Sequence, residues 1–117
     1  MQRHELTAWL GDDHGLTDDQ FEELLAQADE IDDRCGGDHE AASEALTAAY
    51  RLMIEDADTV TFELAQRRAA ARAAELDALA GLQQIAITLI ERGDATESGF
   101  ARQAGVDRMT VRKWLGK

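Results

Sequence analysis

Proline is missing from this chain of 117 residues, and cysteine occurs once, as Cys35. Without proline, no helix has to be interrupted by a missing backbone donor. A single cysteine excludes an internal disulfide framework and fits a reducing compartment. Aromatic residues make up only 5% of the chain, and β-branched residues are sparse outside two short runs. Alanine is abundant and favours helix, so the composition predicts an all-α protein.

Long apolar runs are also missing. The longest purely apolar stretches are far too short to span a bilayer. The first residues, MQRHELTAWLGDD, lack the apolar centre of a signal peptide. We therefore expect a cytoplasmic protein that has no membrane partner. The length fits one compact domain, or a small domain with an attached helical module.

Basic residues are scarce, with 12 Lys and Arg against 24 Asp and Glu and a net charge of −12. Such a balance is unfavourable for a nucleic-acid binder, whose affinity depends on neutralising phosphates. The charges are unevenly distributed, however. Residues 1–58 carry 17 acidic and 3 basic side chains, a net charge of −14, whereas residues 59–117 carry 9 basic and 7 acidic ones, a net charge of +2. This asymmetry indicates two roles in one chain.

The last stretch, TESGFARQAGVDRMTVRKWLGK, predicts two short helices over Glu97 to Ala104 and Arg108 to Leu115. Thr96 and Asp107 supply oxygen-bearing N-caps, and Gly105 suits the left-handed conformation of a sharp turn. Apolar residues fall on one face of each helix and in the turn: Phe100, Ala101, Ala104, Val106, Val111, Trp114 and Leu115. Residues 98–117 carry five basic side chains and one acidic one, a net charge of +4.

Ala101, three further residues, Gly105-Val106, a polar residue and Arg108-x-Thr110-Val111 resemble the helix-turn-helix of bacterial repressors and of the DNA-binding end of Hin-type recombinases. Upstream, residues 79–92 (LAGLQQIAITLIER) followed by Gly93 resemble the first helix of the three-helix unit in these families. The resemblance implies that residues 79–117 bind double-stranded DNA through their last helix. The alternative is an ordinary helical hairpin that ends a bundle.

The predicted DNA contacts follow from position on that helix. Arg108, Met109 and Arg112 are the predicted base readers, because Arg can bind guanine bidentately and an apolar tip can meet a thymine methyl. Thr110 and Lys113 are expected to read bases or hold phosphate. Backbone contacts are expected from Arg102, Lys117, Thr96 and Ser98, helped by the positive end of the first short helix.

The acidic half predicts three helices. A short one covers residues 3–10, with Leu6, Trp9 and Leu10 on one side. The second begins with the capping box Thr17-x-x-Gln20, runs to about Arg34 and stops at Gly36-Gly37. Its inward face consists of Phe21, Leu24, Leu25, Ala28 and Ile31, and Asp38 then caps a third helix with apolar residues at Ala42, Ala45, Leu46, Ala49, Leu52 and Met53. No Gly or Pro occurs from Asp38 to Ala80, so one very long helix is an alternative to the break that we favour near Asp58.

The alanine-rich residues 62–80 form the most helix-prone stretch, and Gly81 behind them is a candidate hinge or kink. The stretch suits either dimerisation or one helix of a monomeric bundle, because no heptad is sustained for three or four repeats. A single helix-turn-helix makes few contacts, so DNA binding predicts a homodimer on half-sites ~34 Å apart.

Catalytic and metal-binding patterns are weak. Cys35-x3-His39 with its neighbouring aspartates lacks the four paired ligands of a structural zinc site, and the acidic residues lack the spacing of a calcium loop. No serine sits in a nucleophile elbow, and no glycine-rich loop could cradle phosphate. We therefore expect no enzymatic activity, no metal and no cofactor.

The sequence thus predicts an all-α DNA-binding protein with an acidic helical bundle or hairpin at 1–58, a connecting or dimerisation helix at 59–78 and a three-helix helix-turn-helix unit at 79–117. A small, dimeric bacterial transcriptional regulator fits best. Alternatives are a DNA-binding subunit of a replication, partition, recombination or packaging complex, and a protein-interaction module whose helix-turn-helix is structural. The acidic half can be a solvated face, a surface for a protein partner or a second copy, or a phosphate mimic.

Overall fold

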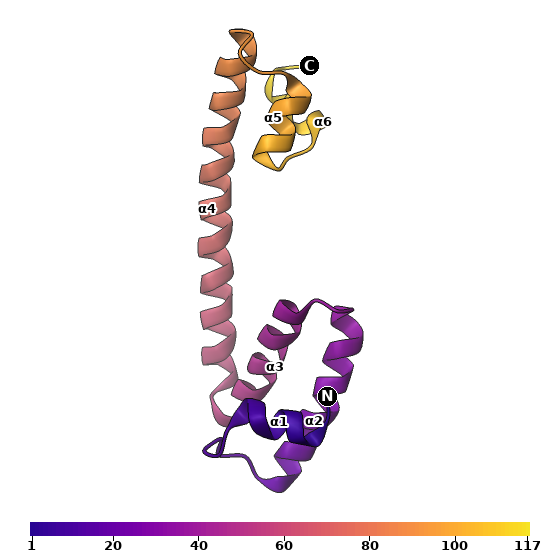
Figure 1. The fold of residues 1–117 in the computed structure, drawn as a ribbon. Helices are drawn as coiled ribbons and strands as arrows, with labels where there is room; N and C mark the ends of the chain where they lie inside the picture. The colour runs from indigo at the N-terminus through magenta and orange to yellow at the C-terminus, as the bar shows by residue number, and fades with distance from the viewer. The chain divides into compact units, whose positions relative to one another are not determined.

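The computed structural model describes residues 1–117, which form helices and no strand (Figure 1). The helices are α1 (Arg3–Leu10), α2 (Asp18–Cys35), α3 (His39–Ile54), α4 (Ala57–Glu91), α5 (Glu97–Ala104) and α6 (Arg108–Trp114). The predicted all-α class is confirmed. The chain divides into two compact units, Met1–Ala65 and Gln66–Lys117, and each is described by itself. The division at residues 58 and 78 concerns function and stays a prediction.

The ends of α2 and α3 follow the predicted capping residues. The Thr17 hydroxyl accepts from the Gln20 amide at 3.2 Å, and the Gln20 side chain accepts from the Thr17 amide at 2.9 Å, which completes the capping box. Gly36 ends α2 in the left-handed conformation, with φ 57° and ψ 36°. Asp38 Oδ1 accepts from the Ala41 amide at 3.0 Å at the start of α3. Local side-chain chemistry therefore sets these boundaries.

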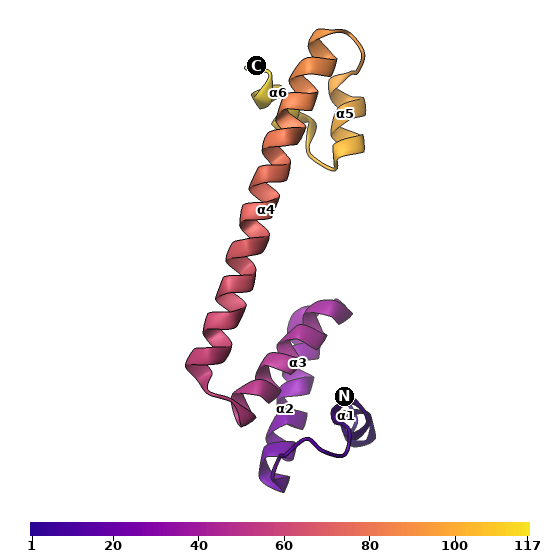
Figure 2. The same cartoon turned by 90° about the vertical axis from the view of Figure 1, so that its left-hand side faces the viewer.

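The first unit closes around a small apolar core in which α2 and α3 lie side by side (Figures 1 and 2). Its buried residues are Leu6, Leu24, Ala28, Ile31 and Leu46. Trp9 lies at the margin, 38% exposed, with its ring edge-on to Tyr50 at a centroid distance of 6.3 Å. The Tyr50 hydroxyl donates to the His14 carbonyl at 2.7 Å and ties down the turn after α1. Leu52, expected on the inward face of α3, is 53% exposed, so that expectation is wrong.

Two helices occupy the region where one very long helix was the alternative. Helix α3 ends at Ile54 and α4 begins at Ala57, so the break lies just before Asp58. Its cause is Asp56, whose Oδ2 accepts from the Thr59 amide at 3.0 Å and from the Thr59 hydroxyl at 3.1 Å. The acidic residue acts as an N-cap and opens α4, because its side chain satisfies a free helix donor.

Helix α4 continues without interruption through Gly81. By length and composition α4 could cross a membrane, although only 6% of its most apolar stretch is buried. Soluble helices also satisfy these two criteria, and the absence of a membrane partner stays a prediction. In the second unit, the C-terminal part of α4 packs on α5 and α6 (Figure 2).

Candidate nucleic-acid interface

The first short helix of the second unit begins and ends where its sequence predicts. The Thr96 hydroxyl caps α5 by accepting from the Gly99 amide at 3.1 Å. A Cβ atom on Gly99 would lie 2.9 Å from that hydroxyl oxygen, so glycine allows the cap to close. Helix α5 ends at Ala104, and α6 ends at Trp114, one residue earlier than expected.

The turn between α5 and α6 depends on one glycine. Gly105 has φ 72° and ψ 31°, the left-handed region that a side chain disfavours. The amides of Gly105 and Val106 both donate to the Ala101 carbonyl, the second at 3.0 Å. Asp107 occupies the N-cap position of α6, as predicted, but its side chain makes no capping hydrogen bond. Its backbone carbonyl accepts from the amides of Thr110 and Val111 instead.

A compact core fixes the orientation of α6. Its buried residues come from three helices: Ala86 from α4, Phe100 and Ala101 from α5, and Val111 from α6. Partly buried residues surround them, namely Leu82, Leu89, Ile90, Ala104, Val106, Trp114 and Leu115. Ala101 is small where the helices approach closely, as its position in the sequence suggested. The inward side of α6 is therefore occupied, and its other side chains are directed outward.

The outward side of α6 is basic with one exposed apolar residue. Met109 is 64% exposed, and the Arg108 side chain is 61% exposed. Lys113 is also exposed, whereas Arg112 and Thr110 are partly buried. These five predicted contact residues therefore lie at the surface of a helix that is fixed by its core.

One acidic side chain, Glu97, lies among the cations of this surface. Its Oε1 is 2.7 Å from Lys117 Nζ, and its Oε2 is 3.1 Å from Arg112 Nη1 and 3.8 Å from Arg108 Nε. The Glu97 side chain is only 14% exposed. Three of the nine predicted DNA-contacting residues are thus brought together around one carboxylate that belongs to the protein.

The neighbouring cations favour the charged form of that carboxylate. The hydrogen bond from Lys117, together with the charges of Lys117 and Arg112, lowers the pKa of the Glu97 carboxyl below its ordinary value. Counting Glu97 with residues 98–117 lowers the net charge of the segment from +4 to +3. The contacts of Glu97 with these cations were not predicted from the sequence. The available signal was an acid directly after the N-cap of an otherwise basic segment.

The remaining predicted contacts lie apart from this cluster. Arg102 and Lys113 are exposed and form no ion pair, and Ser98 is exposed at the start of α5. The Thr96 hydroxyl already accepts the Gly99 amide, which reduces its capacity to contact phosphate. The structure therefore leaves Met109 and Lys113 as the α6 side chains that are both exposed and unpaired.

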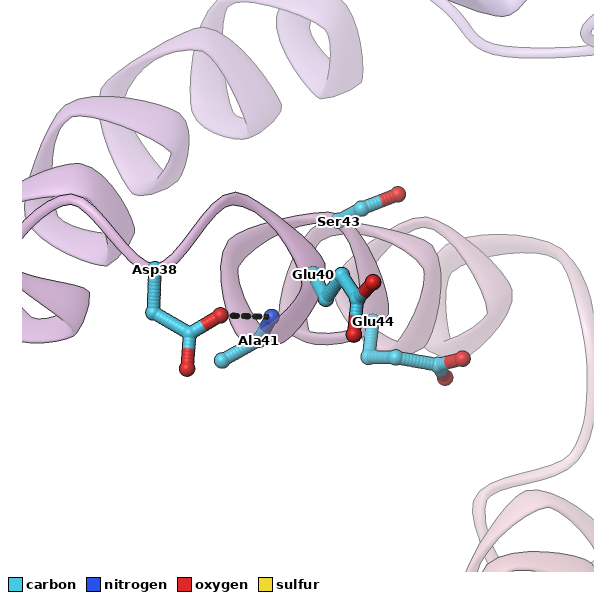
Figure 3. A pocket seen from close by; sticks show the side chains of 5 residues that line it. All are labelled: Asp38, Glu40, Ala41, Ser43 and Glu44. Carbon is cyan, nitrogen blue, oxygen red and sulfur yellow. Dashed lines mark hydrogen bonds between the residues drawn. The ribbon is translucent and has the colours of Figure 1, made fainter.

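A hollow of about 450 Å³ lies in the other unit at the start of α3 (Figure 3). It is lined by Asp38, Glu40, Ala41, Ser43 and Glu44. The Asp38 carboxylate is engaged by the Ala41 amide, and no group of three or more His, Cys, Asp or Glu residues could hold a metal ion. A second hollow of about 310 Å³, on α4 and α5, is lined mostly by apolar residues.

The basic helix α6, its small core and the Glu97 cluster are thus the most distinctive chemical features of the chain. Their interpretation depends on this geometry and on the resemblance of the sequence around Gly105. Comparisons with protein-family models, with curated proteins and with solved structures give no match.

Proposed function

We propose that the protein is a sequence-specific binder of double-stranded DNA that uses α6 as its recognition helix. The observation that carries the proposal is the exposed basic face of α6, held in place by the buried Val111. A helix that is fixed on a core and presents cations outward can enter the major groove without rearrangement of the backbone. A small, cytoplasmic bacterial transcriptional regulator is the role that fits this proposal best.

The residues divide by the chemistry that they offer. Arg108 and Arg112 would bind guanine edges, and Met109 would meet a thymine methyl. Lys113 and Thr110 would bind bases or phosphates. Backbone contacts would come from Arg102, Lys117, Thr96 and Ser98.

Glu97 gives this surface two states. In the free protein its carboxylate compensates Lys117, Arg112 and, at longer range, Arg108. A DNA phosphate carries the same charge and binds the same donors, so phosphates would compete with Glu97 for them. This competition would weaken binding to arbitrary DNA, where phosphate contacts supply most of the affinity.

The test is fluorescence anisotropy over a salt series, with DNA from the region upstream of the protein's own gene and a scrambled duplex. We expect wild-type binding that weakens with salt at a log-log slope of a few units. Arg108→Ala/Arg112→Ala should abolish it, because both predicted guanine readers are lost. Arg3→Ala, in the first unit, is the matched control and should bind as wild type does. Absence of binding by wild type at low salt would refute the proposal.

A protein-interaction role is the second candidate, and a specific observation favours it. Glu97 compensates part of the basic surface internally, and the unit Met1–Ala65 carries 18 acidic against 3 basic side chains. That acidic unit would suit a basic protein partner. A DNA-binding subunit of a larger complex would instead bind DNA through the same α6 residues and purify with its partner.

A further inference from the structure

The middle of α4, residues 65–78, packs on no other part of the chain. These residues are all exposed in the structure. In proteins, a helix derives most of its stability from packing an apolar face on a neighbour. The exposed middle of α4 therefore calls for a partner.

The apolar residues of this region form one stripe. Phe62, Ala69, Ala73, Leu76 and Ala80 recur at steps of three, four or seven residues and so share one helix face. Phe62 is 64% exposed and Leu76 is 54% exposed, which is unusual for large apolar side chains in a soluble protein. The alanines between them allow the backbone of a second helix to approach closely. The shape of the stripe thus fits another helix.

The charged residues beside the stripe indicate which helix can pack on it and whether the two helices run parallel or antiparallel. Arg68 and Arg72 precede the centre of the stripe, and Glu75 and Asp77 follow it. In a parallel pair of identical helices, each arginine would lie beside its own copy, and like charges repel. In an antiparallel pair centred near residue 72, Arg68 of one copy lies opposite Glu75 of the other, and Arg72 lies close to the axis. The pattern is therefore complementary to itself only in the antiparallel direction.

The same charges make a bilayer a poor cover. Arg68, Arg72, Glu75 and Asp77 lie close to the middle of the 35-residue helix. A bilayer that covered residues 65–78 would have to accept these charged side chains, each of which costs free energy in the hydrocarbon. A second protein helix provides opposite charges for these side chains, whereas lipid chains do not.

We propose that the exposed middle of α4 binds α4 of a second copy in an antiparallel helix pair. The two-fold axis lies near Ala71 and Arg72, so that Arg68 of each copy is opposite Glu75 of the other and Leu76 packs beside Ala69. The two copies are related by the symmetry of a palindromic DNA site. The inference specifies the dimer that the proposed function requires, but its tests need no DNA. Failure of the dimer and failure of DNA binding are therefore separate results.

The first experiment measures mass by sedimentation velocity over a concentration series. Wild type should be a dimer, and Arg68→Glu should weaken the dimer on the order of tenfold, because two attractive pairs become repulsive. Arg68→Glu/Glu75→Arg should restore wild-type affinity by exchanging the charges. Arg92→Glu makes the same charge change outside the pair and should have no effect. A wild-type monomer at high concentration, an unaffected Arg68→Glu dimer or a double variant without recovery would overturn the proposal.

The second experiment determines the direction of the pair by cysteine cross-linking in a Cys35→Ser background. Ala73 lies near the axis, so its two copies are about 5 Å apart along the helices, whereas the two copies of Ala80 are about 25 Å apart at about 1.5 Å per residue. Oxidation should therefore cross-link the Ala73→Cys variant and not the Ala80→Cys variant. Equal cross-linking of both variants indicates a parallel pair and overturns the proposal. Flotation of wild type with phosphatidylcholine–phosphatidylglycerol vesicles would overturn it as well, because lipid would then be the cover.

Discussion

The two units of the chain use charge in opposite ways. In Met1–Ala65 the basic groups are the minority, and several of them are held in ion pairs: the N-terminal amine with Asp29, Arg3 with Glu22, and Arg51 with Glu55 and Glu63. In Gln66–Lys117 one acidic residue, Glu97, forms ion pairs with Arg108, Arg112 and Lys117. In the second unit the other acids, such as Glu75, Asp77 and Asp107, remain exposed beside the cations. By net charge the first unit is acidic, at −15, and the second is basic, at +3.

The largest expected effects come from the two cores. Leu24→Ala should destabilise the first unit by about 2–5 kcal/mol, and Phe100→Ala the second by about 3–5 kcal/mol, because both leave cavities at buried positions. If the units are independent, each substitution lowers the unfolding midpoint of its own unit only.

The two tryptophans allow this to be measured, because Trp9 lies in the first unit and Trp114 in the second. Urea unfolding is followed by fluorescence in Trp9→Phe, which reports the second unit, and in Trp114→Phe, which reports the first. A shift of both midpoints by either core substitution would show that the chain unfolds as one cooperative structure.

A smaller effect is expected at the basic surface. Glu97→Gln should raise affinity for DNA roughly three- to tenfold, because it removes the carboxylate that competes with phosphate for Lys117 and Arg112. Asp94→Asn is the matched control, since Asp94 is exposed nearby and forms no ion pair. Anisotropy titrations at one fixed salt concentration measure both variants. Unchanged or weaker binding by Glu97→Gln would mean that this carboxylate does not compete and instead positions the cations.

The smallest effect is a pH dependence that both units should share. The pKa of Glu97 is lowered by its hydrogen bond from Lys117, and that of Glu55 by its hydrogen bond from Arg51. A carboxyl whose pKa is lower in the folded state stabilises the fold above its unfolded pKa, and this stabilisation is lost as pH falls through the folded value.

Each unit should therefore lose stability below about pH 4.5, the ordinary pKa of a glutamate. Glu97→Gln should flatten this loss in the second unit, and Glu55→Gln should flatten it in the first. Urea unfolding at several pH values, followed by the two tryptophans, measures the slopes. Equal slopes in wild type and variant would mean that the pair contributes nothing to acid sensitivity.

The helix ends were predictable because they depend on residues a few positions apart. Thr17 with Gln20, Gly36 and Gly105 each have a local conformational preference that the fold keeps. The break near Asp58 was predicted, but its cause was not, because the Asp56 side chain caps the start of α4. Gly81 does not end α4, since glycine weakens a helix without interrupting it.

The Glu97 cluster was not predictable in the same way. Lys117 lies 20 residues from Glu97 in the sequence, and the two meet only because the turn at Gly105 folds α6 back on α5. Long-range charge pairs depend on helix orientation, which periodicity does not specify. Exposure of Met109 and burial of Val111 followed from helical spacing, but compensation of Arg112 by Glu97 required the fold.

The most direct measurement is an NMR titration of the ¹³C,¹⁵N-labelled protein with duplex DNA at low salt. We expect chemical-shift changes in the amides of residues 96–99 and 108–117, which include Met109 and Lys113. In Met1–Ala65 we expect no changes larger than those caused by diluting the protein without DNA. We also expect the Glu97 side-chain carboxyl signal to move when phosphate displaces it from Lys117. Shifts confined to Met1–Ala65, or no shifts anywhere, would contradict the assignment of DNA binding to α6.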